Sequence, residues 1–126
     1  PPCELLLIDG FDPAGRMGAL GSEPFLQAAR ARLAENGLLA INLLGRDRNF
    51  KALLDRIREV FAGQALALPP TASGNVIVLA HSGERRNYAF ADLEQRATAL
   101  KSETRLDLRP TVQALQASCG GESLHF

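Results

Sequence analysis

Two carboxylates stand where an apolar run gives way to a turn. Asp9 and Asp12 follow the four apolar residues 5–8, and Pro13 and Gly15 come directly after them. Four large apolar residues without polar alternation are typical of a strand covered on both faces, as in parallel α/β sheets. Ligands of such sheets bind beyond the carboxyl ends of the strands. The spacing therefore predicts two carboxylates at the edge of a sheet where α/β proteins bind ligands.

The same residues have a purely structural interpretation. Asp9 and Asp12 can build an Asx-type turn by accepting hydrogen bonds from nearby backbone N–H groups, because Asp, Gly and Pro dominate turns. The three glycines that follow, Gly15, Gly18 and Gly21, have the spacing of a phosphate-binding loop. However, no strand leads directly into them and no Lys-Ser/Thr pair follows, so this stretch is interpreted as a flexible loop.

Two other polar pairs are interpreted as structural. His81 and Ser82 suggest a base beside a nucleophile, but neighbouring residues of a strand point in opposite directions and no nucleophile elbow surrounds them. Arg85 and Arg86 could meet an anion, and a solvated turn is the simpler interpretation. Neither pair adds to the predicted ligand-binding edge.

The elements around the acidic turn follow the order β, α, β, α, β, β, and then one or two helices. Ser22 is the predicted N-cap of the first helix, and Gly37, in a left-handed conformation, is its predicted end. Asp47 is the predicted cap of the second helix. The predicted strands are residues 5–8, 38–44, 65–68 and 75–80, and the predicted helices are residues 23–35, 50–61, 91–104 and 110–117.

The links between these elements predict the sheet topology. A strand, a helix and another strand at residues 5–44 are typical of a parallel βαβ crossover. The breaker-rich link 69–74 is too short for a crossover helix, so the third and fourth strands are expected to pair antiparallel at one edge. Residues 120–126 are expected to be frayed. The fold class is thus α/β, and residues 1–126 are interpreted as a single partial Rossmann-like domain.

Composition restricts the class of partner. The chain has 126 residues, 46% of them hydrophobic, with 14 basic and 14 acidic side chains. Such a balance offers no electrostatic footprint for nucleic acid or for an anionic membrane. No apolar run reaches the roughly 18 residues of a membrane span, so a cytoplasmic location is expected. Cys3 and Cys119 lack the spacing of metal ligands and are interpreted as reduced thiols, and no metal is expected.

Four segments, in order, resemble the spermidine synthase family, aminopropyltransferases with a methyltransferase-like Rossmann fold. The stretch 5–13 resembles the family's strand and Asp-Ser-Ser-Asp-Pro turn, and 24–25 its Glu-Phe-Tyr helix start, with Leu26 in place of the Tyr. The stretch 33–42 is similar to Leu-x-x-x-Gly-x-Leu-x-x-Gln, with Asn42 replacing the Gln. The stretch 69–74 is similar to Pro-Thr-Tyr-Pro-Ser-Gly, with Thr71 where the family has an amine-contacting Tyr.

The resemblance implies a chemistry. In the family a primary amine attacks the carbon beside the sulfonium of decarboxylated S-adenosylmethionine and releases methylthioadenosine. Asp9 would accept the amine's proton, and Asp12 would hold the substrate's ammonium. Asn42 and Thr71 would line the amine site. Pro13 and Ala14 would contact the co-substrate.

The resemblance also implies what this chain would do. It corresponds to the C-terminal half of the family's Rossmann domain, with the cofactor-binding half expected upstream, so the fragment alone is expected to bind no cofactor and to be inactive. Two alternatives remain open: a non-catalytic binding or dimerisation module of the same fold, and a small-molecule S-adenosylmethionine-dependent methyltransferase. The expected partners are a small-molecule amine and a second copy in a homodimer, the latter because residues 5–8 would form an exposed sheet edge.

Overall fold

The computed structural model describes residues 1–126, which fall into two compact units, residues 1–84 and 85–126. The prediction that residues 1–126 form a single partial domain stays a prediction. The elements of the first unit are β1 (Cys3–Ile8), a 3-10 helix (Gly18–Gly21), α1 (Glu23–Arg32), β2 (Leu33–Leu44), α2 (Phe50–Val60), β3 (Ala65–Ala67) and β4 (Asn75–His81). Those of the second are β5 (Asn87–Ala89), α3 (Phe90–Thr104), α4 (Arg109–Cys119) and β6 (Ser123–His125).

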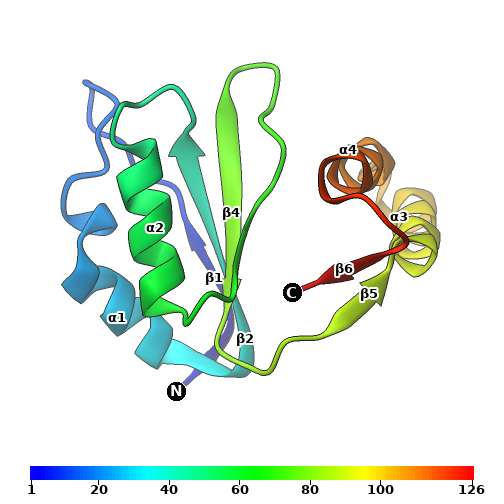
Figure 1. The fold of residues 1–126 in the computed structure, drawn as a ribbon, viewed down its shortest axis with the longest axis horizontal. Helices are drawn as coiled ribbons and strands as arrows, with labels where there is room; N and C mark the ends of the chain where they lie inside the picture. The colour runs from blue at the N-terminus through cyan, green and yellow to red at the C-terminus, as the bar shows by residue number, and fades with distance from the viewer. The chain divides into compact units, whose positions relative to one another are not determined.

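A mixed four-stranded sheet in the order β1-β2-β4-β3 forms the frame of the first unit (Figure 1). β1 pairs parallel with β2, with Ile8 opposite Ile41, as expected of a βαβ crossover. β4 pairs antiparallel with both β2 and β3, so the predicted antiparallel pair and its place at one edge are confirmed. The α/β fold class is therefore confirmed, with the sheet of a Rossmann-like half domain.

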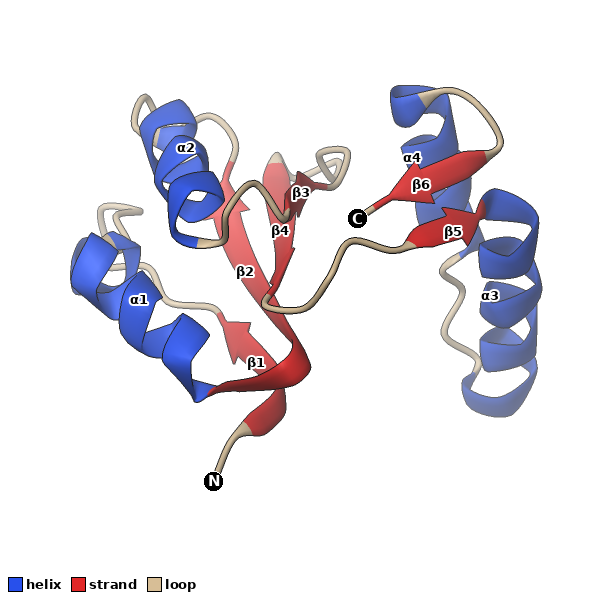
Figure 2. Ribbon diagram, turned by 60° about the horizontal axis from the view of Figure 1, so that its bottom comes forward, coloured by secondary structure: helices blue, strands red, loops and turns tan.

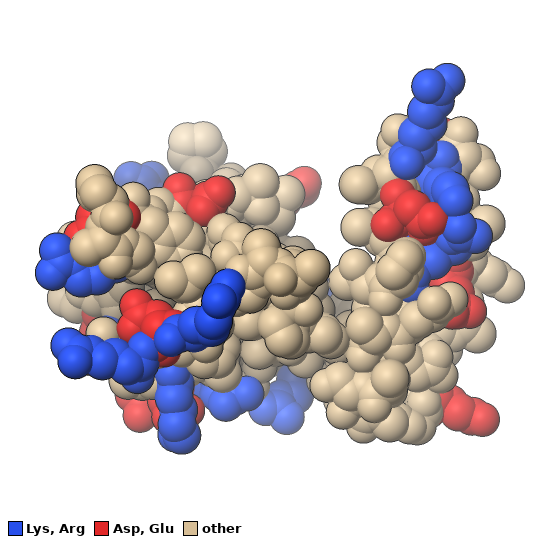
Figure 3. Space-filling model, turned by 90° about the horizontal axis from the view of Figure 1, so that it is seen from above, with Lys and Arg blue, Asp and Glu red and all other residues tan.

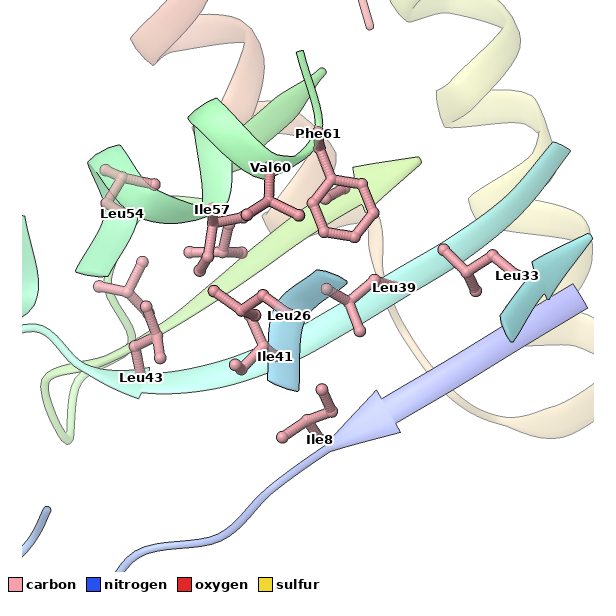
Figure 4. Close-up of a cluster of buried hydrophobic side chains, with 13 residues drawn as sticks. Ile8, Leu26, Leu33, Leu39, Ile41, Leu43, Leu54, Ile57, Val60 and Phe61 are labelled. Carbon is pink, nitrogen blue, oxygen red and sulfur yellow. The ribbon is translucent and has the colours of Figure 1, made fainter. Parts of the chain in front are cut away.

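Helices α1 and α2 lie on the same side of this sheet (Figure 2). Alternate residues of β2 point toward them, and Leu39, Ile41 and Leu43 are at most 1% exposed. Leu26 from α1 and Ile57 from α2 meet these strand residues in one cluster (Figure 4). Burying a side chain of this size stabilises the fold by about 1.5–3 kcal/mol. The amphipathic pattern that predicted α2 thus corresponds to its packing on the sheet.

Three local details differ from the sequence-based predictions. α1 begins as predicted, because the Ser22 hydroxyl accepts a hydrogen bond from Phe25 N, but it ends at Arg32 and not near residue 35. Residues 33–37 already belong to β2, since Leu33 pairs with Cys3 of β1. Gly37 is not left-handed. A Cβ there would stand 2.9 Å from the Cys3 carbonyl oxygen, so close approach of β1 explains the glycine.

The predicted cap of α2 is the third difference. The Asp47 carboxylate accepts a hydrogen bond from Asn49 N at 2.7 Å, in the turn that precedes the helix. Asn49 occupies the N-cap position and its side chain makes no capping hydrogen bond. Asp47 therefore shapes the approach to α2 rather than capping its first turn.

The second unit contains two elements that the sequence did not predict. β5 and β6 pair antiparallel, with Tyr88 opposite Leu124, so residues 123–125 are a strand and not a frayed end. Arg86 and Phe126 extend the pair by two backbone hydrogen bonds, at 2.7 and 2.9 Å. The helices α3 and α4 were expected and are confirmed, and they pack against each other. The long range of the β5–β6 pairing explains why local patterns missed it.

Candidate functional site

One edge of the four-stranded sheet gathers all the predicted site residues. β1 and β2 run parallel and end together, so Asp9 follows β1 beside the last residues of β2. β4 runs the other way, and its first residue, Asn75, pairs with Leu44 at the end of β2. The loop 69–74 between β3 and β4 therefore reaches the same edge. This is the edge at which parallel α/β sheets bind their ligands.

Asp9 and Asn42 meet across this edge. The Asn42 side-chain amide donates a hydrogen bond from Nδ2 to Asp9 Oδ1 at 3.2 Å. Leu43 points into the helix-covered core, so Asn42 next to it projects from the opposite face of the sheet. Asp9 is exposed, and its second carboxylate oxygen has no hydrogen-bond partner. Asn42 Oδ1 also has no hydrogen-bond partner, but this oxygen is buried. The pair combines a solvent-accessible carboxylate with a fixed amide.

Asp12 is used by the turn itself. Its Oδ1 accepts hydrogen bonds from Ala14 N at 2.9 Å and from Arg16 N at 2.8 Å, and its Oδ2 accepts one from Arg16 Nε at 2.9 Å. The backbone N–H of Arg16, followed by the Arg16 guanidinium, lowers the pKa of Asp12 below its ordinary value of 3.8, although partial desolvation opposes the shift. Asp12 therefore forms the Asx-type turn that was the structural interpretation of this residue.

Thr71 makes its hydrogen bonds within its own loop. Its hydroxyl lies 2.9 Å from Ser73 Oγ and accepts a hydrogen bond from Asn75 N at 3.1 Å. Arg46, just after β2, donates from a terminal nitrogen to Ser73 O at 3.0 Å and so fastens this loop to the β2 end. Thr71 shares the edge with Asp9 and Asn42 but makes no hydrogen bond to either.

Pro13 and Ala14 are exposed at the outside of the acidic turn. Ala14 contributes its backbone N–H to Asp12, and contact of the two residues with a co-substrate stays a prediction. Sequence reasoning did not single out Arg16. Its position four residues after Asp12, with opposite charge, is the signal that would have found it.

A cavity of about 410 Å³ lies beside the turn, on the helix-covered side of the sheet. Phe11, Met17, Leu43, Phe50 and Leu53 give it an apolar lining, and Arg16 and Arg56 also border it. Arg56 donates to Gly21 O at 2.6 Å and so ties α2 to the 3-10 helix that follows the acidic turn. Leu43 and Leu44 both line the cavity, so it reaches around the end of β2, and the cavity and the Asp9–Asn42 pair lie near the same edge of the sheet.

The surface charges, the possible metal ligands and the helix lengths indicate no further site. In the space-filling view, basic and acidic side chains are intermingled on each unit (Figure 3). No group of three or more His, Cys, Asp or Glu side chains is arranged to hold a metal ion. None of the helices has the length and apolar character needed to cross a membrane. Both cysteines are free thiols.

The sheet topology, and the polar residues gathered where β1 and β2 end, define an α/β protein with a Rossmann-like half domain. Compared with known proteins, the chain is 31% identical over 123 residues to a polyamine aminopropyltransferase of Neisseria meningitidis, a match that covers 98% of the chain and 47% of the relative. It is 27% identical over 113 residues to a polyamine aminopropyltransferase of Chromobacterium violaceum, covering 90% of the chain and 43% of the relative. No family model and no solved structure matches.

These matches confirm the resemblance to the C-terminal half of the spermidine synthase family, and the chain is related to the polyamine aminopropyltransferases. The chain spans about half the length of the curated relatives it matches.

Proposed function

We propose that this chain forms the amine-binding part of an aminopropyltransferase-like protein. The observation that carries the proposal is the hydrogen bond between Asn42 and Asp9, which joins the ends of two parallel strands at the ligand-binding edge. The relatives named polyamine aminopropyltransferase support the reaction class. The exposed carboxylate supports the choice of an amine as the ligand at this edge.

The reaction needs a group that accepts a proton. Decarboxylated S-adenosylmethionine would supply an aminopropyl group, and the carbon of that group bonded to the positive sulfur is the one activated for attack. The amine nitrogen forms a bond to that carbon, the carbon–sulfur bond breaks with its electron pair staying on sulfur, and methylthioadenosine leaves. The nitrogen must lose a proton, because an amine at neutral pH is mostly protonated and has no free electron pair.

Asp9 is suited to this proton transfer. Asn42 holds one carboxylate oxygen, so the side chain is oriented, while the other oxygen has no hydrogen-bond partner and is accessible to an ammonium. No basic side chain forms an ion pair with Asp9, unlike Asp12. Asp9 would therefore orient the amine and accept its proton, and Asn42 would position Asp9. General-base assistance of this kind contributes about 10²- to 10⁴-fold in rate.

The experiment compares Asp9→Asn with the wild type in the full-length protein in which this chain occurs. Methylthioadenosine release should fall at least about 10²-fold, while the KM for the nucleoside co-substrate stays nearly constant, because the substitution removes the proton acceptor and keeps the shape of the side chain. Asp92→Asn, an exposed position in the first turn of α3, is the matched control and should retain full turnover. Equal turnover in both variants would contradict the proposed role of Asp9.

A second candidate function is a binding module that does not catalyse transfer. It is favoured by Leu26, which occupies the place of the family's Tyr and is fully buried in the core, and by the loop-internal hydrogen bonds of Thr71. Neither Leu26 nor Thr71 is then available to contact an amine in the way that the family's Tyr side chains would. Binding of an amine without any methylthioadenosine release from the full-length protein would favour this candidate.

A further inference from the structure

Asp47 is a carboxylate in the turn that leads from β2 to α2. Its backbone N–H donates to Leu44 O at 3.0 Å, and its carbonyl oxygen accepts a hydrogen bond from Phe50 N at 2.9 Å. Its Oδ1 accepts a hydrogen bond from Asn49 N at 2.7 Å, so the turn orients the side chain. Its Oδ2 makes no hydrogen bond, and the carboxylate forms no ion pair. Asp47 thus combines a fixed position with an unused acceptor.

The cavity of about 410 Å³ is shared by the acidic turn and the turn that contains Asp47. Phe11 and Met17 line it from the side of the acidic turn, and Asp47 and Phe50 line it from the other side. Leu44, at the end of β2, also lines it. Apolar walls of this kind suit a chain of methylene groups, with a charged end group placed at a polar residue.

Asp47 is the one acidic residue among those that line the cavity, and two arginines border it. Arg16 is paired with Asp12, and Arg56 donates to Gly21 O. Neither arginine forms an ion pair with Asp47. Direct contact therefore does not neutralise the Asp47 carboxylate, and its Oδ2 can accept a charge-assisted hydrogen bond from an ammonium group.

Asp12, to which the family resemblance assigns the substrate's ammonium, is already engaged. Its Oδ1 accepts two backbone hydrogen bonds, and its Oδ2 accepts one from Arg16 Nε. Three of the roughly four acceptor positions of a carboxylate are thus used, one of them by a guanidinium. Asp47 offers an ammonium group an oxygen that has no other partner.

The distance along the edge suits a short diamine. Asp9 lies beside Asn42, and a strand rises about 3.3 Å per residue, so Leu44 is about 7 Å beyond Asn42. Asp47 N lies 3.0 Å from Leu44 O, which places Asp47 on the order of 10 Å from the Asp9–Asn42 pair. The nitrogens of extended 1,4-diaminobutane are about 6 Å apart, and a hydrogen bond of about 2.8 Å at each end extends its reach to about 12 Å.

We infer that Asp47 binds the second ammonium of a diamine whose first amine lies at the Asp9–Asn42 pair. The inference rests on the proposed function. The methylene chain lies along the apolar wall at the end of β2, and Asp47 takes the place that the resemblance gives to Asp12. Asp47 is therefore a specificity-determining residue, which favours a second positive charge and takes no part in the proton transfer.

The test measures the binding of 1,4-diaminobutane and n-butylamine to residues 1–126 at constant ionic strength by NMR titration. The Asn42 side-chain amide reports the first amine, and the Asn49 backbone amide, which donates to Asp47, reports the second. Asp47→Asn removes the charge and keeps an oxygen that can accept from Asn49 N. It should weaken diamine binding about fivefold, the effect expected for two unit charges about 4 Å apart in water, and change monoamine affinity less than twofold.

Glu35→Gln is the matched control, because Glu35 is exposed, lies near the opposite end of β2 and forms no ion pair. It removes the same charge from the chain and should leave both affinities unchanged. Diamine binding that Asp47→Asn weakens no more than monoamine binding, or no more than Glu35→Gln does, would overturn the role of Asp47 and leave the proposed function standing. Absence of any shift at Asn42 with either amine would instead overturn the amine site itself, and the inference with it.

Discussion

The two faces of the four-stranded sheet are built from the same strands and do different work. Toward the helices, Leu39 and Ile41 are fully buried (Figure 4). On the opposite face Leu5 and Leu7 of β1 are 54% and 69% exposed, and Asn42 meets Asp9 at its edge. Because side chains alternate along a strand, neighbouring residues serve opposite faces. One face therefore provides the stability that lets the other carry exposed apolar and polar groups.

The largest expected effect tests the stability side of this comparison. Ile41→Ala should lower the free energy of unfolding by about 2–5 kcal/mol, because it leaves a cavity among residues that are fully buried. Leu7→Ala removes an exposed side chain of similar size and should change stability by less than about 0.5 kcal/mol. Chemical denaturation of both variants gives the two values. Similar losses would show that the opposite face also holds the fold together.

A smaller effect tests what the exposed leucines do. β1 pairs with β2 along one side only and stands at the edge of the sheet, so we expect residues 1–126 to self-associate through β1 of a second copy. Burying about 400 Å² of apolar surface would contribute about 10 kcal/mol before the costs of association. Leu7→Lys should weaken the dimer at least about tenfold, because it places a charge in the interface.

Light scattering over a range of concentrations measures this association. Arg48→Gln serves as the control, since Arg48 is exposed and remote in sequence from β1. A wild-type chain that remains monomeric at high micromolar concentration would refute the dimer. A dimer that persists in Leu7→Lys would locate the interface elsewhere.

The smallest effect concerns the acidic turn that follows β1. The largest cause of the lowered pKa of Asp12 is the Arg16 backbone N–H, which Arg16→Gln retains, so in that variant the pKa should rise yet stay below the ordinary 3.8. Because the pKa of Asp12 is lower in the folded state, ionised Asp12 stabilises the turn at every pH above the ordinary pKa of 3.8. This stabilisation is lost as the pH falls through the pKa of the folded state. Carbon-13 NMR titration of the Asp12 carboxyl measures this directly. A pKa of 3.8 or above in the variant would assign the whole shift to the side chain.

Local signals predicted most of the first unit. The apolar run of β1, the Ser22 cap and the amphipathic pattern of α2 each determine an element from neighbouring residues alone. The end of α1 was predicted wrongly because pairing of Leu33 with Cys3, thirty residues away, overrides helix propensity. The pairing of β5 with β6 was missed for the same reason, since two three-residue strands carry no periodicity.

The sequence predicted where the candidate site lies, but not which hydrogen bonds its residues make. Asp9 and Asn42 were expected at the edge, and the parallel register brings them within hydrogen-bond distance. The engagement of Asp12 by Arg16 depends on the conformation of the turn, and the loop-internal hydrogen bonds of Thr71 depend on its hairpin. Residue types identify which groups are capable of chemistry, while backbone geometry decides which of them are available.

The orphaned oxygen of Asn42 has an evolutionary consequence. A buried acceptor without a partner costs about 1–3 kcal/mol, so an apolar residue of similar size at this position would make the sheet more stable. A library of variants selected only for folding should therefore lose Asn42 early, whereas selection for ligand binding at the edge should retain it. Position 42 thus separates two evolutionary pressures within one strand, since the buried leucine and isoleucine beside it should survive both selections.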